Sequence, residues 1–100
     1  AEFGGAVTLG PGATMNVQSG GTLRVTNSVT FTNNGTLNIA GGGTLELQGG
    51  GAVTGTAVNY QATNSLLLYS GVASKTTTAA ELPPTMPGSV NCSNTSSVLV

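Results

Sequence analysis

Residues 6–27 read AVTLGPGATMNVQSGGTLRVTN, and residues 28–49 read SVTFTNNGTLNIAGGGTLELQG. The two segments align without a gap when Ser28 is set over Ala6, which places Gly42-Gly43-Thr44-Leu45 over Gly20-Gly21-Thr22-Leu23. Other aligned positions are Thr8 with Thr30, Thr14 with Thr36 and Asn16 with Asn38. A fixed period of this length is the sequence signature of a stacked repeat architecture.

Within each 22-residue unit, an apolar-x-apolar triplet recurs at intervals of about eight residues. The triplets are Val7-Thr8-Leu9, Met15-Asn16-Val17, Leu23-Arg24-Val25, Val29-Thr30-Phe31, Leu37-Asn38-Ile39 and Leu45-Glu46-Leu47. Because side chains alternate across a strand, the first and third residues of each triplet face one side and the middle residue faces the other. Three short strands and three turns per unit predict an all-β chain that forms a parallel β-helix, or β-solenoid, with a narrow apolar interior.

A third coil follows with slight slippage of the period. Val53 continues the first side, Val58-Asn59-Tyr60 corresponds to Leu37-Asn38-Ile39, and Leu66-Leu67-Leu68 corresponds to Leu45-Glu46-Leu47. The last two matches are each one position short of the period that relates the first two units. The predicted outward columns are Asn16–Asn38–Asn59 and Thr22–Thr44–Ser65, with Arg24 beside Glu46. The residues predicted to face inward are Leu9, Val17, Leu23, Val25, Phe31, Leu37, Ile39, Leu45, Leu47 and Leu66.

The alternation stops after the third coil and returns near the end of the chain. Pro83-Pro84 excludes a central strand, so we expect an excursion over residues 70–88. The segments Val90-Asn91-Cys92-Ser93-Asn94 and Val98-Leu99-Val100 match the first two triplets of the second unit, which predicts that Cys92 is buried at the place of Phe31. We therefore expect one module of about four coils over residues 1–100, with regular coils at 5–69, the excursion at 70–88 and a returning coil at 89–100.

A longer pattern occupies residues 65–100. Its parts are Tyr69-Ser70-Gly71-Val72-Ala73, Thr76-Thr77-Thr78, Glu81-Leu82-Pro83, Val90-x-Cys92-x-Asn94 and Ser97-Val98-Leu99-Val100. This pattern resembles the recurring segment of large secreted β-helix proteins of Bacteroidetes-type bacteria, which have the form Y-x-G-x-x-x-x-T-T-x-x-E-[LF]-P followed by L-x-I-N-N and G-V-T-L. The resemblance implies a secreted or cell-surface repeat that is adhesin-like or fibre-forming, and it supplies no catalytic residues.

The last residues repeat the pattern of the first, because Ser97-Val98-Leu99-Val100 resembles Ala6-Val7-Thr8-Leu9. This similarity predicts that the partners are copies of the chain joined head to tail, or neighbouring repeats in a longer chain. A solenoid exposes an unpaired strand edge at each end, and a head-to-tail contact that does not close propagates into a filament. The expected assembly edges are Val7, Leu9, Val98, Leu99 and Val100.

The composition argues against most enzymes and several kinds of binding protein. Five residues of the 100 are charged, and the sequence has no Asp and no His. Acid–base catalysis, zinc binding and calcium binding all draw on those residue types, so we expect no enzymatic activity, no cofactor and no metal site. Two basic residues and a net charge of −1 are too few for a nucleic-acid partner. The longest apolar run, Leu66-Leu67-Leu68-Tyr69, is far below the roughly 20 residues of a membrane span, so we expect no membrane insertion.

These observations predict a structural module of an extracellular or cell-surface fibre or adhesin that assembles by end-to-end strand stacking. The alternative is a β-solenoid that binds ice or a glycan. Ice binding would use Thr8, Thr30-x-Thr32 and Thr54-x-Thr56, whereas a glycan would stack on Tyr60 and Tyr69. The triplets that begin at Asn34, Asn91 and Asn94 match the N-glycosylation motif.

Overall fold

The computed structural model describes residues 2–96 and 98–99, and these residues form thirteen short strands. The strands are β1 (Glu2–Phe3), β2 (Val7–Leu9), β3 (Thr14–Val17), β4 (Thr22–Val25), β5 (Thr30–Asn33), β6 (Thr36–Ile39), β7 (Thr44–Gln48), β8 (Ala52–Gly55), β9 (Asn59–Tyr60), β10 (Leu66–Ser70), β11 (Lys75–Thr76), β12 (Ser89–Cys92) and β13 (Val98–Leu99). The described residues contain no helix. The all-β prediction is confirmed, and the predicted assembly-edge residue Val100 lies outside the described part of the chain.

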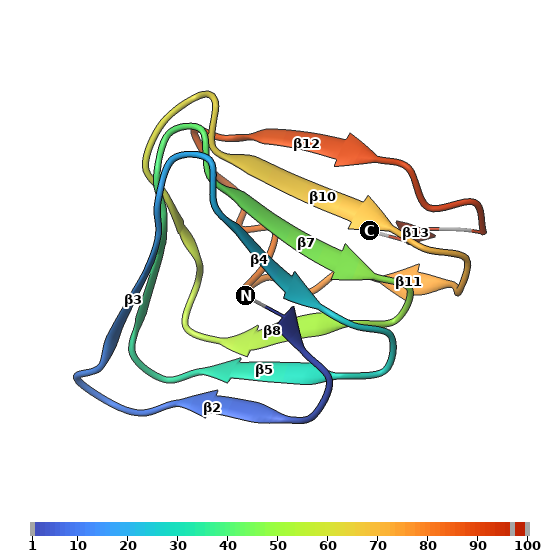
Figure 1. The fold of residues 1–100 in the computed structure, drawn as a ribbon, viewed down its shortest axis with the longest axis horizontal. Coiled ribbons are helices and arrows are strands. Elements are labelled where there is room, and N and C mark those ends of the chain that lie inside the picture. Colours follow the sequence, from blue (N-terminus) through green and yellow to red (C-terminus); the bar gives the residue numbers. More distant parts are fainter. Residues whose placement is uncertain (1, 97, 100) are drawn as a thin grey trace.

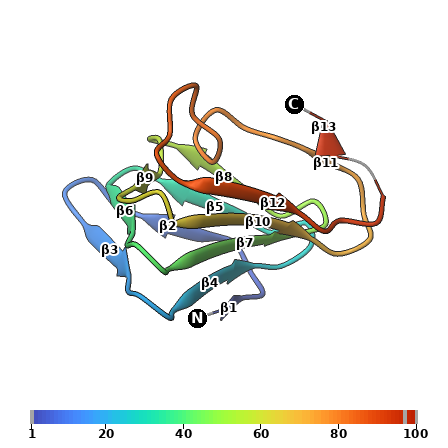
Figure 2. The same cartoon turned by 90° about the horizontal axis from the view of Figure 1, so that it is seen from above.

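The strands stack in parallel into three main sheets that enclose a triangular interior (Figures 1 and 2). Sheet A has the order β1-β4-β7-β10-β12, sheet B the order β2-β5-β8, and sheet C the order β3-β6-β9, while β11 pairs with β13. The chain visits sheets B, C and A in turn, so each passage through the three sheets is one coil. The predicted β-solenoid is confirmed, with about four turns and with coils of the length that the repeat indicated.

Inward-facing apolar side chains from the three sheets form one core. The buried residues with an apolar or aromatic side chain are Val17, Leu23, Val25, Val29, Phe31, Leu37, Ile39, Leu45, Leu47, Val53, Val58, Tyr60, Leu67, Tyr69 and Ala80. Leu9, which was also predicted to face inward, is half-buried and packs against this core at the first layer. The strands therefore follow the alternation that the triplets predicted, with one face of each sheet in the core.

The register of sheet B differs from the shift that relates the two repeat units. Val7 pairs with Phe31 and Thr8 with Thr32, so the predicted pairing of Thr8 with Thr30 is wrong. The first coil turns from β2 to β3 through the longer corner Gly10–Ala13, whereas the second coil turns through Asn34 and Gly35. The shorter corner fits beneath the longer one, since a Cβ atom at Gly35 would lie 2.2 Å from the Ala13 carbonyl oxygen. Only glycine allows this approach.

The third passage through sheet A also differs from its predicted register. The sequence alignment sets Leu66 over Leu45, one position earlier than the structure does. Leu67 pairs with Leu45, and Tyr69 pairs with Leu47, so the third coil keeps the same period as the first two in this sheet. Leu66 therefore lies in the outward column with Thr44 and is half-exposed, and the prediction that Leu66 faces inward is wrong. Ser65, predicted for that outward column, is buried before the strand, and its hydroxyl donates to the Ile39 carbonyl oxygen at 2.8 Å.

The returning segment joins a different side of the solenoid from the one predicted. Strand β12 pairs with β10 in sheet A, and Cys92 lies opposite Tyr69 instead of taking the place of Phe31. Cys92 is exposed, so the prediction of a buried thiol is wrong. The physical reason is that residues 77–88 pass over the ends of sheets B and C without forming a strand. The chain has therefore returned to sheet A when strand pairing resumes at β12.

The predicted Asn16–Asn38–Asn59 column and the predicted Arg24–Glu46 pair are confirmed, whereas Ser65 does not complete the Thr22–Thr44 column. The Asn38 side-chain amide donates to Asn16 Oδ1 at 2.9 Å, and the Asn59 amide donates to Asn38 Oδ1 at 2.9 Å. Arg24 lies beside Glu46, and its Nε donates to Glu46 Oε1 at 3.0 Å. Such ladders satisfy polar side chains on the outer faces of stacked strands.

Candidate functional site

The excursion lies over the C-terminal side of the third coil. The Thr78 hydroxyl donates to the Val53 carbonyl oxygen, and the Val58 N–H donates to the Ala80 carbonyl oxygen at 2.8 Å. Leu82 and Met86 are half-buried against the core. Residues 78–86 therefore cover the interior where a regular fourth coil would have placed strands over β8 and β9.

An ion pair inside the apolar interior holds this excursion. Lys75 Nζ lies 3.0 Å from Glu81 Oε1, and the exposed fractions of the two side chains are 2% and 0%. The Val53 backbone N–H donates to the same carboxylate oxygen at 3.1 Å, and the Tyr69 hydroxyl donates to Glu81 Oε2 at 2.9 Å. Three donors thus compensate a carboxylate that has lost all contact with water.

Both tyrosines belong to this buried cluster. The Tyr60 hydroxyl donates to the Glu81 backbone carbonyl oxygen at 2.5 Å, and Tyr60 and Tyr69 are 2% and 1% exposed. Neither ring is available to stack on a sugar, so the predicted glycan platform is wrong. Burial, reinforced by the nearby Glu81 charge, raises the pKa of both phenols above their ordinary value.

Sequence reasoning missed the Lys75–Glu81 pair, although one signal was present. The interval from Tyr69 to Lys75 is the same as the interval from Val25 to Phe31 and from Leu47 to Val53. That interval marks an inward position at the start of sheet B. A lysine there needs a buried carboxylate, and Glu81 was the next acidic residue along the chain.

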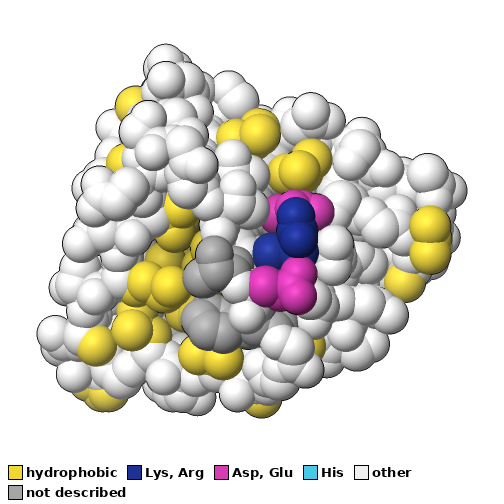
Figure 3. Space-filling view, viewed as in Figure 1, with side chains coloured by type: hydrophobic (Ala, Val, Ile, Leu, Met, Phe, Trp, Pro, Cys, Tyr) yellow, Lys and Arg dark blue, Asp and Glu magenta, His cyan; other side chains and the backbone are white. Residues whose placement is uncertain are grey.

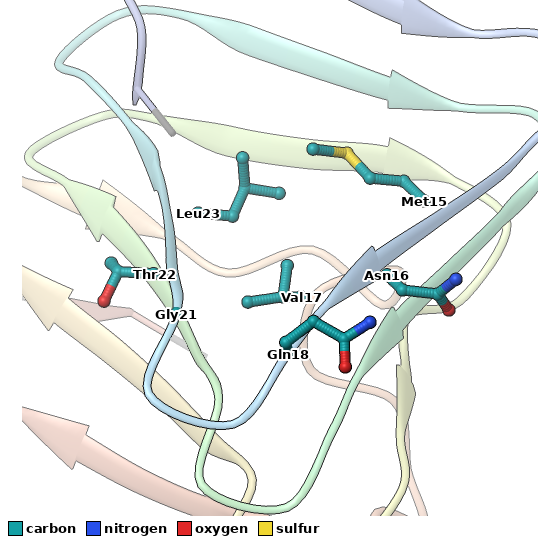
Figure 4. Close-up of a pocket in the computed structure, with 7 residues that line it drawn as sticks. All are labelled: Met15, Asn16, Val17, Gln18, Gly21, Thr22 and Leu23. Carbon is teal, nitrogen blue, oxygen red and sulfur yellow. The ribbon is translucent and has the colours of Figure 1, made fainter.

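The N-terminal end of the solenoid is covered only in part, because β1 pairs with β4 while no described strand lies over β2 or β3. A hollow of about 230 Å³ lies between β3 and β4. Figure 4 shows Met15, Val17 and Leu23 pointing into it, while Asn16 and Gln18 point away. None of the seven residues that line the hollow is charged. The predicted assembly-edge residues Val7 and Leu9 are half-buried at this same end.

The C-terminal end presents β12 and β13. No described strand pairs with the outer edge of β12, and all four of its residues are exposed. Val98, a predicted assembly-edge residue, is half-buried and pairs with Lys75, while Leu99 pairs with Thr76. The two ends therefore differ, since the excursion covers the interior over β8 and β9 at the C-terminal end, whereas a hollow remains between β3 and β4 at the N-terminal end.

A row of charged side chains runs across the outer face of sheet A, beside the hollow (Figure 3). Arg24 bridges Glu2 and Glu46, with N–O distances of 3.1 and 3.0 Å. Burial raises the pKa of Glu46, but hydrogen bonds from Ser70 and Arg24 outweigh it and leave that pKa below its usual value. These interactions fasten neighbouring layers together at the surface.

The three N-glycosylation triplets occupy different environments. Asn34 is exposed in a corner, where its backbone N–H donates to the Leu9 carbonyl oxygen. Asn91 is exposed on β12. Asn94 is half-buried, and its side-chain nitrogen donates to the carbonyl oxygens of Ser70 and Ala73 at 3.1 and 2.8 Å. A glycan on Asn94 would disturb both bonds, so Asn34 and Asn91 are the more accessible acceptors.

Within residues 2–96 and 98–99, no group of three or more metal-ligating side chains comes together. The same residues contain no helix long and apolar enough to cross a membrane. The predictions of no cofactor and no enzymatic activity stay predictions. No family model, curated protein or solved structure matches the chain.

Proposed function

We propose that the chain is a structural module of a secreted or cell-surface fibre or adhesin, and that it assembles through its two ends. The observation that carries this proposal is that sheet A begins and ends with strands β1 and β12, whose outer edges have no partner among the described strands. An unpaired strand edge is a template for another strand. Because every pairing in the solenoid is parallel, an added layer that preserves the strand direction extends the stack along its axis.

The side faces of the solenoid pair polar groups within the molecule, which favours the two ends as the sites of assembly. The polar outer columns of sheets A and C are paired within the molecule, through the Arg24–Glu46 and Asn16–Asn38–Asn59 ladders. Side faces whose polar and charged groups are already paired within the molecule offer little to hold a second copy side by side. The resemblance to secreted β-helix repeats supports an extracellular location, which remains part of the proposal.

Sedimentation velocity and negative-stain electron microscopy of the purified chain over a wide concentration range test the assembly. We expect species that lengthen with concentration and unbranched filaments of constant width. Monomers at every concentration would contradict the proposal.

Ice binding is a second candidate, because Thr8, Thr32 and Thr54 form one outward column on sheet B. The column is one threonine wide, since Thr30 pairs with Ala52. An ice-recrystallisation assay tests this candidate, with Thr32→Lys as the disruptive variant. Equal inhibition by the wild type and by Thr32→Lys would remove the sheet B column from consideration.

A further inference from the structure

The inward-facing columns of sheet A end at solvent-exposed residues at the C-terminal end. One inward column is Leu23–Leu45–Leu67–Val90. Its first three members are at most 1% exposed, whereas Val90 is 49% exposed. The neighbouring inward column ends at Cys92, which is also exposed. These side chains lack the next layer that covers their equivalents inside the solenoid.

The loop between β11 and β12 projects from this same end. Figure 2 shows its orange-red part rising above β8 and β12, on the side opposite to β1. Pro84, Thr85 and Pro87 are exposed on the loop, and no residue from 82 to 100 is charged. Proline side chains lose little conformational freedom when they are buried. The loop is therefore an uncharged, partly apolar projection.

The N-terminal end offers the complementary shape. The hollow of about 230 Å³ is lined by Met15, Val17 and Leu23 and by uncharged polar residues. Figure 3 shows apolar side chains in a hollow beside the charged row, on the face that Figure 1 also views. Because neither the hollow nor the loop carries a charge, bringing them together leaves no ion without water.

We propose that the hollow receives the exposed Pro84 and Thr85 side chains of the 82–88 loop of a second copy of the chain, and that β12 of that copy pairs in parallel with β1. This inference rests on the proposed function and specifies the joint, meaning the contact between the C-terminal end of one copy and the N-terminal end of the next. The register follows from the columns: Glu2 and Asn91 are the two ends of the outward column that contains Arg24, Glu46 and Leu68. Continuing that column across the joint places Asn91 of one copy opposite Glu2 of the next.

Disulfide trapping tests this register. The test variant is Glu2→Cys/Asn91→Cys/Cys92→Ser, which changes exposed residues and removes the native thiol. Directly opposed residues on neighbouring strands are about 4.8 Å apart, within the Cα separation that a disulfide accepts. The matched control is Glu2→Cys/Ser89→Cys/Cys92→Ser, in which the second cysteine lies on the same face but two residues away, roughly 6.6 Å along the strand.

Under mild oxidation, non-reducing electrophoresis should show a ladder of multimers for the Asn91 variant, formed at least tenfold faster than for the Ser89 control. Equal rates in the two variants, with filaments still present, would overturn the register and leave the proposed function standing. Monomers in sedimentation together with no ladder would overturn both.

A charge on the loop tests the hollow separately. Thr85→Lys places an ammonium group on the exposed loop, and Thr30→Lys places one on the exposed side of the second coil. We expect Thr85→Lys to weaken association at least tenfold and Thr30→Lys to change it less than twofold, with unchanged circular dichroism for both. Equal association of the two variants would show that the loop does not enter the hollow.

Discussion

Lys75 and Glu81 are two of the five charged residues in the chain, and they are its most deeply buried ones. An ion pair in a low-dielectric interior gains little net stability over an apolar pair, but the loss of one partner leaves an uncompensated charge. Glu81 also accepts hydrogen bonds from Val53 and Tyr69, which belong to different sheets. We interpret the pair as the interaction that fixes where the excursion sits on the third coil.

Lys75→Met should destabilise the fold by about 3–5 kcal/mol, because it leaves the Glu81 carboxylate buried without its cation. Chemical denaturation followed by circular dichroism measures the change. The control is Lys75→Met/Glu81→Gln, in which the glutamine oxygen still accepts from Val53 N–H and no charge is buried. The double variant should recover most of the loss. A loss equal to the sum of the losses measured for Lys75→Met alone and for Glu81→Gln alone would show that the pair is not coupled.

The two tyrosines predict a response to alkaline pH. Their pKa values are raised in the folded state, so the stability that they contribute is complete below the ordinary tyrosine pKa of about 10 and declines as the pH rises above it. Absorbance at 295 nm should show no tyrosinate until the protein unfolds. A titration with a midpoint near pH 10 and unchanged circular dichroism would mean that the rings are accessible.

At the scale of the elements, corner length sets the register between coils. Coils one and two keep the period of the repeat in sheets A and C, where Leu23 pairs with Leu45 and Met15 with Leu37. In sheet B the pairing partner lies two positions further along, because the Gly10–Ala13 corner takes up the difference. The corner of the second coil then passes close beneath, with Gly35 under the Gly10 and Ala13 carbonyl oxygens. Turn chemistry in this fold therefore decides which residues face each other on neighbouring strands.

Gly35→Ala should cost about 1–3 kcal/mol, the usual range for overpacking, since its Cβ would contact backbone that cannot move freely. Gly10→Ala is the matched control, because a Cβ there meets nothing within 4 Å. Thermal unfolding of both variants gives the comparison. Equal melting temperatures would indicate that the two corners are not packed as described.

The repeat made most of the strands predictable, and the irregular elements were the ones that sequence reasoning misplaced. Triplets such as Leu37-Asn38-Ile39 specify an inward face through local alternation, which depends on nothing outside the strand. Leu66 and Cys92 were misassigned because their facing depends on corner and excursion lengths, which tertiary contacts set. The Lys75–Glu81 pair was missed because a buried ion pair becomes visible only when the excursion is placed on the coil.

At the scale of the whole molecule, the two ends of the solenoid are different from each other. Its N-terminal end has an apolar hollow, and its C-terminal end has a projecting loop and an unpaired β12 edge. Unlike ends on a short cylinder favour a head-to-tail arrangement over a closed dimer.

The axial rise of the filament, measured by electron microscopy with helical reconstruction, is the sharpest test of head-to-tail stacking. Sheet A contributes five strands per copy, and neighbouring strands are about 4.8 Å apart, so head-to-tail stacking predicts a rise of about 24 Å per subunit along the filament. A rise of about 4.8 Å per chain would mean that each chain adds one layer to a cross-β stack and would contradict the account. Finding no filament at any concentration would contradict it as well.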